Sequence, residues 1–163
     1  MIRECRLDDI RKIYYIINEA AIAYEGIIPS NCYHQPYMPM HELRRERKRI
    51  TFFGEELNSE LIGIMGFQLI RDATLIRHAY VLSKWQRQGI SSNILNYLKG
   101  MVTTPLLLVG TWAEAHWAIA FYKKHGFGLL SNKEEVLKTY WEISQNQIEN
   151  SVVLGIDLKK GQT

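Results

Sequence analysis

The stretch Val81–Leu95 constrains the fold of this chain most, because it joins an apolar strand end, a short basic and amide-rich turn, and a helix that begins at a glycine. A helix start leaves its first backbone N–H groups without helical acceptors and carries a partial positive charge, so it can bind a phosphate through the main chain. Gly89 has no Cβ and lets an anion approach these amides, while Arg87 and Lys84 add positive charge. This order of elements predicts an anion site.

Two blocks of the sequence resemble one family. Gln86-Arg87-Gln88-Gly89-Ile90-Ser91 is similar to the acyl-CoA signature of the GNAT superfamily of N-acetyltransferases, which has Gln or Arg, two variable residues, Gly, one variable residue, and Gly or Ala. Ser91 departs from the last position but is small. Ala118–Phe127 resembles the second conserved block, an Ala-bearing helix with a Tyr, a closing Gly and a Phe that starts the next strand. The two blocks cover the middle of the chain and occur in the expected order.

Hydrophobic periodicity predicts the other elements. Strands are expected at Ile2–Cys5, Ile50–Glu55, Leu61–Ile70, Ala73–Leu82, Leu106–Thr111, Phe127–Leu130 and Ser151–Leu158. Helices are expected from Asp8 to about Gly26, from His41, from Gly89, and over Trp112–His125, with a short helical turn at Glu134–Tyr140. The order β-α-α-β-β-β-α-β-α-β-β is that of the GNAT fold, in the α/β (α+β layered) class. The resemblance implies a mixed, mostly antiparallel sheet of about seven strands with about four helices.

The length favours a single domain over residues 1–163, and the resemblance implies that it is an N-acetyltransferase domain. The formal net charge of +3 is too small to indicate nucleic-acid binding. Cys5 and Cys32 form no disulfide or metal pattern, so we expect no metal and a reducing, cytoplasmic compartment. The charged first residues do not suit a signal peptide, and no apolar run is long enough to span a membrane. A homodimer is compatible with the sequence but is not indicated by it.

Two segments allow more than one interpretation. The run Arg44–Arg49 is basic, but because it contains Glu46 and no aromatic residue, a solvated helix face is favoured over a nucleic-acid patch. The aromatic loop Ile27–Met40 either lines a substrate pocket or covers the edge of the core. In the first case Tyr33 and His34 contact the acceptor, and we add Trp112 to this acceptor-binding set.

The resemblance implies acetyl-CoA as the cosubstrate. Backbone N–H groups along Ala79, Tyr80 and Val81 are then expected to stabilise the oxyanion that forms on the thioester carbonyl. The expected cofactor-binding residues at the turn and the helix start are Gln86, Arg87, Gln88, Gly89, Ile90, Ser91 and Ser92.

Tyr122 is the expected general acid. Helical spacing places Ala115, Ala118, Ile119 and Tyr122 on one face, where small residues leave room for a pantetheine arm. The phenol would then give a proton to the departing CoA thiolate. A core Tyr with a locally bonded hydroxyl is the alternative. The family often has Asn where this chain has Ala115, so the pantetheine contact made there must come from another residue.

The general base is sought on the strand Thr74–Leu82. Side chains alternate along a strand, which places Arg77 and His78 on opposite faces unless a bulge intervenes. His78 titrates near neutrality and is the chemically better base, with a structural His as the alternative. The resemblance implies that the face of Arg77 looks at the substrate, where a guanidinium would bind an acceptor carboxylate. Glu114, His116 or a water chain to solvent are further alternatives.

Three functions follow from the resemblance. The first is transfer of an acetyl group from acetyl-CoA to a primary amine of a small molecule or amino acid, by direct attack in a ternary complex. The second is acetylation of a protein or peptide amine. The third is a non-catalytic acyl-CoA-binding sensor. The sequence does not identify the acceptor.

Overall fold

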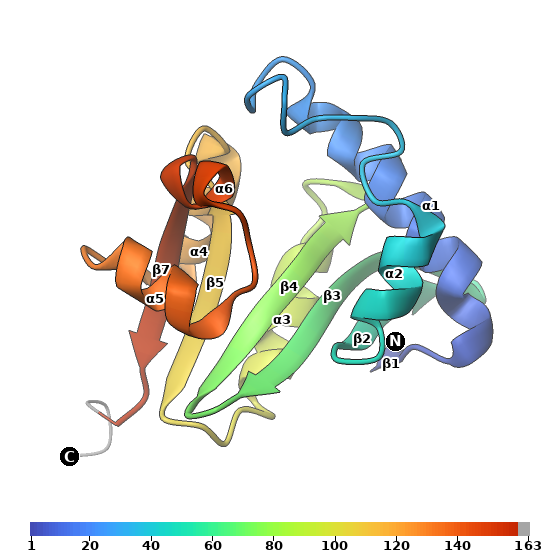
Figure 1. Cartoon of the computed structure of the whole chain (residues 1–163). Coiled ribbons are helices and arrows are strands. Elements are labelled where there is room, and N and C mark those ends of the chain that lie inside the picture. The colour runs from blue at the N-terminus through green and yellow to red at the C-terminus, as the bar shows by residue number, and fades with distance from the viewer. Residues whose placement is uncertain (160–163) are drawn as a thin grey trace. The chain divides into compact units, whose positions relative to one another are not determined.

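The computed structural model describes residues 1–159, so residues 160–163 of the expected domain lie outside the described part (Figure 1). The strands are β1 (Ile2–Glu4), β2 (Thr51–Leu57), β3 (Glu60–Ile70), β4 (Ala73–Val81), β5 (Leu106–Trp112), β6 (Gly128–Leu129) and β7 (Ser151–Asp157). The helices are α1 (Ile10–Ala20), α2 (Met40–Glu46), α3 (Ile90–Lys99), α4 (His116–Lys124), α5 (Lys133–Tyr140) and α6 (Gln145–Glu149). The strands follow the order β1-β2-β3-β4-β5-β7-β6 in one sheet, which confirms the predicted mixed α/β class.

The chain forms two compact units. Unit 1 consists of Met1–Ala23, His34–Gln68 and Ile76–Val102, and unit 2 consists of Tyr24–Tyr33, Leu69–Leu75 and the chain from Thr103 onward. The strands β3 and β4 each contribute residues to both units. Whether residues 1–163 behave as one domain stays a prediction.

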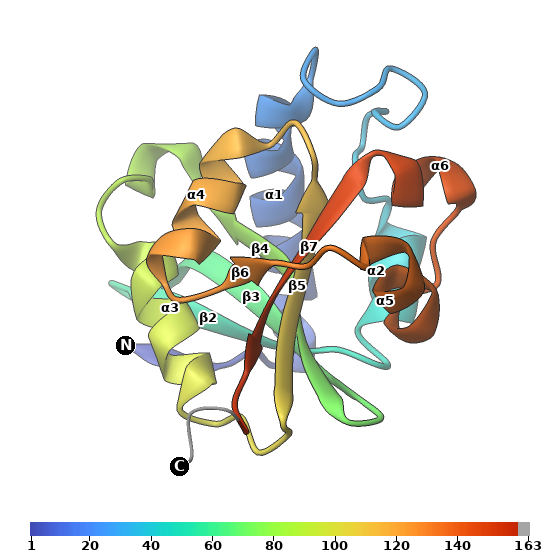
Figure 2. The ribbon, with the colours of Figure 1, turned by 90° about the vertical axis from the view of Figure 1, so that its left-hand side faces the viewer.

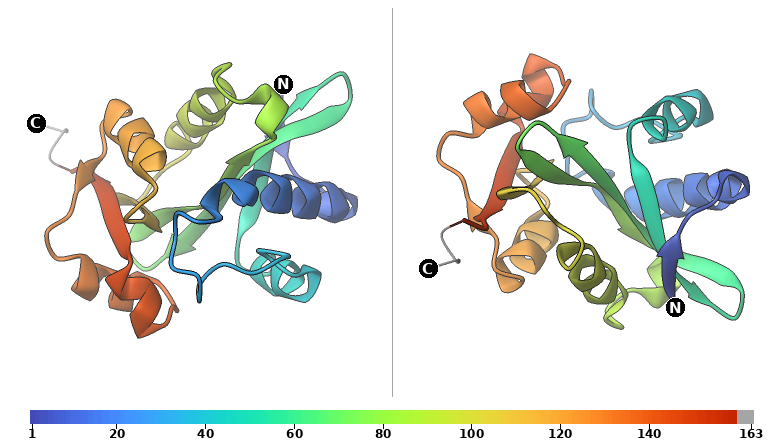
Figure 3. Two further views of the ribbon diagram at one scale, coloured as in Figure 1. Left: turned by 90° about the horizontal axis from the view of Figure 1, so that it is seen from above. Right: turned by 90° about the horizontal axis from the view of Figure 1, so that it is seen from below.

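In unit 1, helices cover both faces of the strands. Figures 1 and 3 show α1 and α2 on one face and α3 on the other. The α1 face is filled at helical spacing by Ile10, Ile13 and Ile17, which pack with Leu43 of α2. On the other face the Phe53 ring lies 6.0 Å from the Tyr97 ring of α3, measured between centroids. The helix expected to begin near Asp8 and the strand expected at Leu61–Ile70 are therefore present as α1 and β3.

Gly66 of β3 brings its neighbours unusually close. A Cβ at this position would lie 2.8 Å from the Arg77 carbonyl oxygen and 2.6 Å from Ile50 Cγ2. Real Cβ atoms do not come this close to backbone atoms, so only glycine fits between Ile50 and Arg77. This close approach fixes the part of β4 that carries Arg77 and His78.

In unit 2, β5 and β7 pair antiparallel from Leu106↔Asp157 to Trp112↔Ser151. The short β6 pairs with the other edge of β7. Figure 2 shows α4 on one side of β7 and α5 and α6 side by side on the other. Leu137 of α5, Ile148 of α6 and Val153 of β7 form one buried cluster, so both small helices are anchored to the sheet.

Two predicted boundaries and the expected number of helices differ from the structure. The helix expected from Trp112 begins at His116, because Trp112 is still paired with Ser151 in β5 and Ala115 is the N-cap residue. The described chain has six α-helices rather than about four, since Glu134–Tyr140 belongs to a true helix and α6 was not predicted. The β6 strand is limited to Gly128–Leu129. Among residues 1–159, no helix is both long enough and apolar enough to cross a membrane.

Candidate active site

The start of α3 has the backbone geometry of an anion site. Gly89 is the N-cap residue and takes a left-handed conformation with φ of +81°. The first amide that bonds back within the helix is that of Asn93, which donates to the Gly89 carbonyl at 3.0 Å. The amides of Ile90 and Ser91 lie in the first turn, where the helix itself offers no acceptor. A Cβ on Gly89 would meet no atom within 4 Å outside its chain neighbours, so the space at this position is open.

The side chains of the turn have two different roles. Gln86 Nε2 donates to the Val81 carbonyl at 3.0 Å, and Gln88 Nε2 donates to the Lys84 carbonyl at 3.3 Å. These two amides therefore stabilise the turn itself. Arg87 is exposed and has a φ of +63°, so the turn contains a second left-handed residue close before Gly89. That Gln86, Arg87, Gln88, Ile90, Ser91 and Ser92 contact a cofactor stays a prediction.

Glu19 of α1 fixes the beginning of this turn, and sequence reasoning missed it. The Ser83 amide donates to both carboxylate oxygens of Glu19, at 3.1 and 3.0 Å. A long-range bond of this kind has no signal in the local sequence. It ties the segment after β4 to α1 within unit 1.

His78 interrupts the alternation of β4. Its φ is +51°, a left-handed value that a non-glycine residue rarely adopts. As a result Arg77 and His78 both reach the same carboxylate, that of Glu46 at the end of α2. The two side chains therefore contact one carboxylate, whereas strict alternation along the strand places them on opposite faces.

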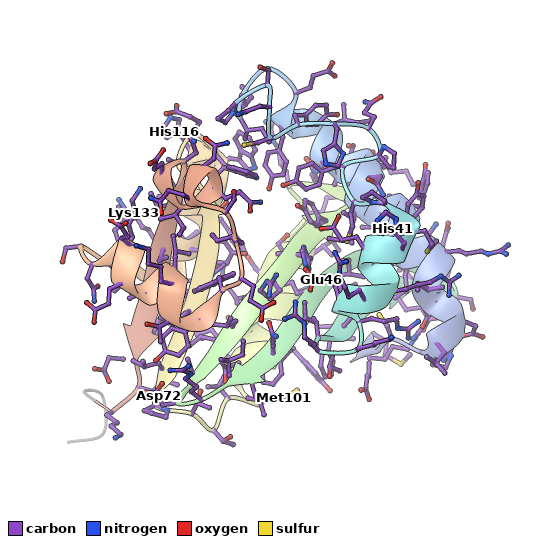
Figure 4. All side chains as sticks on the ribbon, viewed as in Figure 1. His41, Glu46, Asp72, Met101, His116 and Lys133 are labelled. Carbon is purple, nitrogen blue, oxygen red and sulfur yellow. The ribbon has the colours of Figure 1, made fainter. Side chains whose placement is uncertain are left out.

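Glu46 is the centre of a buried polar cluster that includes Gln68, Arg77 and His78. Glu46 Oε1 lies 3.3 Å from Arg77 Nη2 and 3.4 Å from His78 Nε2. Arg77 Nη1 also donates to Gln68 Oε1 at 2.8 Å. Figure 4 marks Glu46 on the side of α2 that faces β3 and β4. The solvated face expected for Arg44–Arg49 is observed at Arg44, Arg45, Lys48 and Arg49, which are exposed, but Glu46 is only 8% exposed.

The charges of this cluster are set by its contacts. The interaction with His78, followed by the charge of Arg77, lowers the pKa of Glu46 to about 2, against the opposing effect of burial. Arg49 Nη2 holds the other oxygen, Oε2, at 3.0 Å. Burial lowers the pKa of His78 below its ordinary value, and Glu46 opposes this in part. At neutral pH the cluster thus contains a carboxylate, two guanidinium groups and a neutral imidazole.

The His78 imidazole is packed in place, but one of its ring nitrogens lacks a hydrogen bond within the described part of the chain. Its ring stacks on Phe52 with centroids 6.2 Å apart. Nε2 is buried and has no hydrogen-bond partner among residues 1–159, and its contact with Glu46 Oε1 at 3.4 Å is a charge contact only. A buried polar atom without a partner is rare and calls for an explanation.

Tyr122 lies in unit 2, on α4, with 4% of its surface exposed. Its ring packs edge-on against Phe121 and Phe127, at centroid distances of 5.1 and 5.4 Å. Burial raises the pKa of Tyr122, and the nearby Tyr24 phenol adds to this effect. Tyr24 in turn stacks on Trp117, with centroids 6.0 Å apart. Tyr122 is therefore protonated across the neutral pH range.

The expected acceptor-binding residues are spread over both units. His34 of unit 1 is exposed, and its Nδ1 lies 2.7 Å from the Pro36 carbonyl oxygen. Tyr33 and Trp112 belong to unit 2, where Trp112 is buried at the end of β5. Ala79 and Tyr80, at the end of β4, are half-buried. Within residues 1–159, no group of three or more His, Cys, Asp or Glu side chains could hold a metal ion.

A mixed α/β sheet in which a strand leads through a turn into a helix start at a left-handed glycine is the arrangement expected of an acyltransferase domain, and comparison with known sequences agrees. The profile of the acetyltransferase (GNAT) domain matches residues 48–128, about half of the chain. The chain belongs to the GNAT superfamily of N-acetyltransferases. A comparison with curated protein sequences gave no significant match.

Solved structures share the fold over nearly the whole chain. The PaiA N-acetyltransferase of Thermoplasma acidophilum, in complex with coenzyme A, is 15% identical, with 96% of this chain and 98% of that chain covered and a TM-score of 0.73. The ribosomal-protein-S18-alanine N-acetyltransferase of Escherichia coli is 16% identical over 97% and 93%, with a TM-score of 0.72. A Bacillus subtilis acetyltransferase in complex with CoA is 16% identical over 96% and 97%, with a TM-score of 0.64.

Proposed function

We propose that this chain transfers an acetyl group from acetyl-CoA to a primary amine of a small molecule or amino acid, by direct attack in a ternary complex. The observation that carries the proposal is the left-handed Gly89 at the start of α3, where a Cβ would meet open space. A diphosphate suits this position, because the helix start supplies both amide donors and positive potential. Lys84 and Arg87 add charge at the same turn. In the GNAT family, two proteins with this fold were solved with CoA bound.

The acyl group would be activated next to the anion site. In the proposed reaction, backbone N–H groups along Ala79, Tyr80 and Val81 donate to the carbonyl oxygen as it becomes an oxyanion. The Val81 carbonyl is held by Gln86, which fixes the end of β4 relative to the turn. Donors that are already in place stabilise the developing charge without reorganisation.

Tyr122 is proposed as the acid that protonates the CoA thiolate. A phenol has an ordinary pKa of about 10 and a thiol of about 8.5, so the transfer is uphill by roughly 2 kcal/mol unless the thiolate is destabilised. Burial of a thiolate beside the buried phenol acts in that direction, because a low-polarity site penalises the anion. Burial raises the pKa of Tyr122 and makes this transfer harder, so Tyr122 acts as the acid only where the site destabilises the thiolate more than the phenolate.

The acceptor needs a base and contacts for its other groups. His78 is proposed as the base, since it is neutral at pH 7 and lies directly before the proposed oxyanion donors. Tyr33, His34, Arg77 and Trp112 are proposed as acceptor contacts. The guanidinium of Arg77 is oriented by Gln68 and Glu46, and it would bind a carboxylate on the acceptor. We place the reaction in the cytoplasm, on composition alone.

A protein or peptide amine is the second candidate acceptor. The observation in its favour is the structural likeness to the E. coli enzyme that is named for the alanine of ribosomal protein S18. In that case the loop around Tyr33 and His34 would admit a peptide terminus rather than a small molecule.

Two measurements test the proposal together. The first is the melting temperature of the protein with and without acetyl-CoA, and the second is thiol release on a panel of small amines, amino acids and peptides. Stabilisation with turnover on small amines supports the proposal, and turnover on peptides alone supports the second candidate. Stabilisation without turnover on any amine indicates a sensor. No stabilisation at millimolar acetyl-CoA contradicts cofactor binding altogether.

A further inference from the structure

We propose that Glu46 is a positioning residue, which holds His78 in the tautomer that carries its proton on Nε2 and thereby makes Nδ1 the proton acceptor of the reaction. The inference deepens the proposed acetyl transfer and rests on it. It is carried by the contacts of the buried cluster in unit 1, none of which is visible in the local sequence.

The tautomer follows from what each group can do. An ionised carboxylate only accepts hydrogen bonds, whereas a neutral imidazole has one N–H and one lone pair. Glu46 Oε1 lies 3.4 Å from His78 Nε2. A lone pair on Nε2 would face this negative oxygen and be repelled, while an N–H there is attracted to it. The second ring nitrogen, Nδ1, then carries the lone pair.

Glu46 is suited to this role because it cannot easily move or become neutral. Arg49 holds Oε2 at 3.0 Å and Arg77 holds Oε1 at 3.3 Å. The pKa of about 2 keeps the carboxylate charged at neutral pH. In catalytic triads a buried carboxylate orients the imidazole and stabilises the imidazolium, and Glu46 is proposed to act on His78 in the same way.

The groups that face His78 come from all the elements around it. Glu46 and Glu42 of α2 favour its protonated form, and Arg77 of β4 disfavours it. Phe52 of β2 covers the ring, and desolvation is the largest effect. His78 is therefore a neutral base at pH 7, which is the form that can accept a proton.

The backbone brings His78 next to the proposed reaction centre. His78 directly precedes Ala79, the first of the proposed oxyanion donors, and adjacent strand residues are about 3.3 Å apart along the chain. The left-handed φ of +51° turns His78 to the side of β4 on which Arg77 also meets Glu46. A non-glycine residue in this conformation is strained, and such strain is concentrated at functional sites.

The proposed reaction balances in protons. The acceptor ammonium loses one proton to His78 Nδ1, and the resulting imidazolium keeps its Nε2–H towards Glu46. The neutral amine forms a bond to the thioester carbonyl carbon, and the carbon–sulfur bond breaks. The CoA thiolate takes a proton from Tyr122, which is restored by the proton that the nitrogen loses as the amide forms. His78 then releases its proton to water, so each turnover yields one amide, one CoA thiol and one proton.

The test is a nitrogen NMR spectrum of the imidazole of His78 in the uniformly ¹⁵N-labelled full chain, recorded over a pH series and assigned with His78→Gln. We expect protonated Nε2 and unprotonated Nδ1 in the wild-type protein. In Glu46→Gln we expect a mixture of tautomers and a lower pKa of His78, because the favourable charge is gone. Glu42→Gln is the matched control on the same helix and should keep the wild-type tautomer.

The wild-type spectrum decides the tautomer even if Glu46→Gln does not fold. A proton on Nδ1 in the wild-type protein overturns the inference, as does an unchanged pKa of His78 in a folded Glu46→Gln variant. An activity series then tests the role: kcat should fall about tenfold or more in Glu46→Gln and by about 10² or more in His78→Gln, with the affinity for acetyl-CoA kept. If the tautomer is as expected but no amine is acetylated by the wild-type protein, the proposed function fails and the pairing of Glu46 with His78 stands.

Discussion

Gly89 has a φ of +81°, and a Cβ built on it would meet no atom within 4 Å. The position is therefore restricted by its backbone and not by crowding. Any L-residue placed here pays about 1–2 kcal/mol for the left-handed conformation. A methyl group would also stand in the space through which an anion approaches the first amides of α3.

We therefore predict that Gly89→Ala loses most of its affinity for acetyl-CoA and about 1 kcal/mol of stability. Gly128→Ala is the matched control, because a Cβ at Gly128 also meets open space but the residue has no left-handed φ. Isothermal titration with acetyl-CoA and urea unfolding measure the two effects. Equal affinity in the two variants would show that the diphosphate does not bind at Gly89.

A second residue-scale prediction concerns Tyr122. Replacing it with Phe keeps the ring between Phe121 and Phe127 and removes only the hydroxyl. We expect kcat to fall by about 10² or more, with little change in the affinity for acetyl-CoA, since a general acid acts on the transition state. Tyr140→Phe serves as the control, because its hydroxyl donates to Asp72 in the same unit. Steady-state rates with a working amine decide, and an unchanged kcat in Tyr122→Phe removes Tyr122 from the mechanism.

Single residues show where sequence reasoning reaches its limit. The Gly89 turn was predictable because its signal is local, a glycine at the junction of a strand and a helix. The pairing of His78 with Glu46 was not, because the partners are far apart in the chain and the left-handed φ of His78 breaks the alternation that the prediction used. Glu46 did have a weak signal: it is the one acid in a basic run, on a helix whose other face is apolar.

At the scale of elements, α2 is more than a packing helix, because its last residue carries the buried carboxylate of unit 1. The folded-state pKa of Glu46 is about 2, below its value in an unfolded chain. A depressed carboxyl pKa contributes stability above the unfolded pKa, and this stability is lost as the pH falls through the folded pKa. His78 acts in the same direction, because its lowered pKa makes the unfolded chain bind the proton more readily below about pH 6.5.

The prediction is that the wild-type protein loses stability on acidification between about pH 4.5 and 2, of the order of 3 kcal/mol from Glu46 alone. In Glu46→Gln this part of the pH dependence should be absent, while the stability at pH 7 is already lower because Arg49 and Arg77 have lost their shared carboxylate. Urea unfolding at a series of pH values measures both. Glu134→Gln is a control, since Glu134 is an exposed partner of Lys138. The same acid slope in wild-type and Glu46→Gln would contradict the assignment.

The elements also show which parts of the fold periodicity can predict. Long amphipathic segments such as α1 and continuous apolar strands such as β3 were located from their spacing. The five-residue α6 is too short for a periodic signal. The only sequence feature that marks its start is the capping box, in which the side chains of Ser144 and Gln147 each form a hydrogen bond with the backbone N–H of the other residue. The start of α4 was misplaced because Trp112 suits a strand end and a helix equally well, and only the pairing with Ser151 decides.

At the scale of the whole molecule, the two units share two strands, since β3 and β4 each contribute residues to both. If β3 or β4 unfolds, both units lose residues that belong to them. We predict a single cooperative unfolding transition, as expected if residues 1–163 act as one domain. Trp85 reports on unit 1, whereas Trp112, Trp117 and Trp141 report on unit 2. Fluorescence of variants that keep only Trp85 or only Trp141 should give the same urea midpoint as far-ultraviolet circular dichroism.

The same experiment with acetyl-CoA connects the fold to its proposed ligand. A ligand that binds only the folded chain adds about 2.7 kcal/mol of stability at a concentration of 100 times its Kd. Because β3 and β4 couple the two units, we expect this gain at the midpoints of both tryptophan probes, although the proposed diphosphate site lies in unit 1. The gain should shrink with salt, since Lys84 and Arg87 are exposed and their attraction to phosphate is screened. A shift of the Trp85 midpoint alone would show that the units unfold separately and would contradict the single domain.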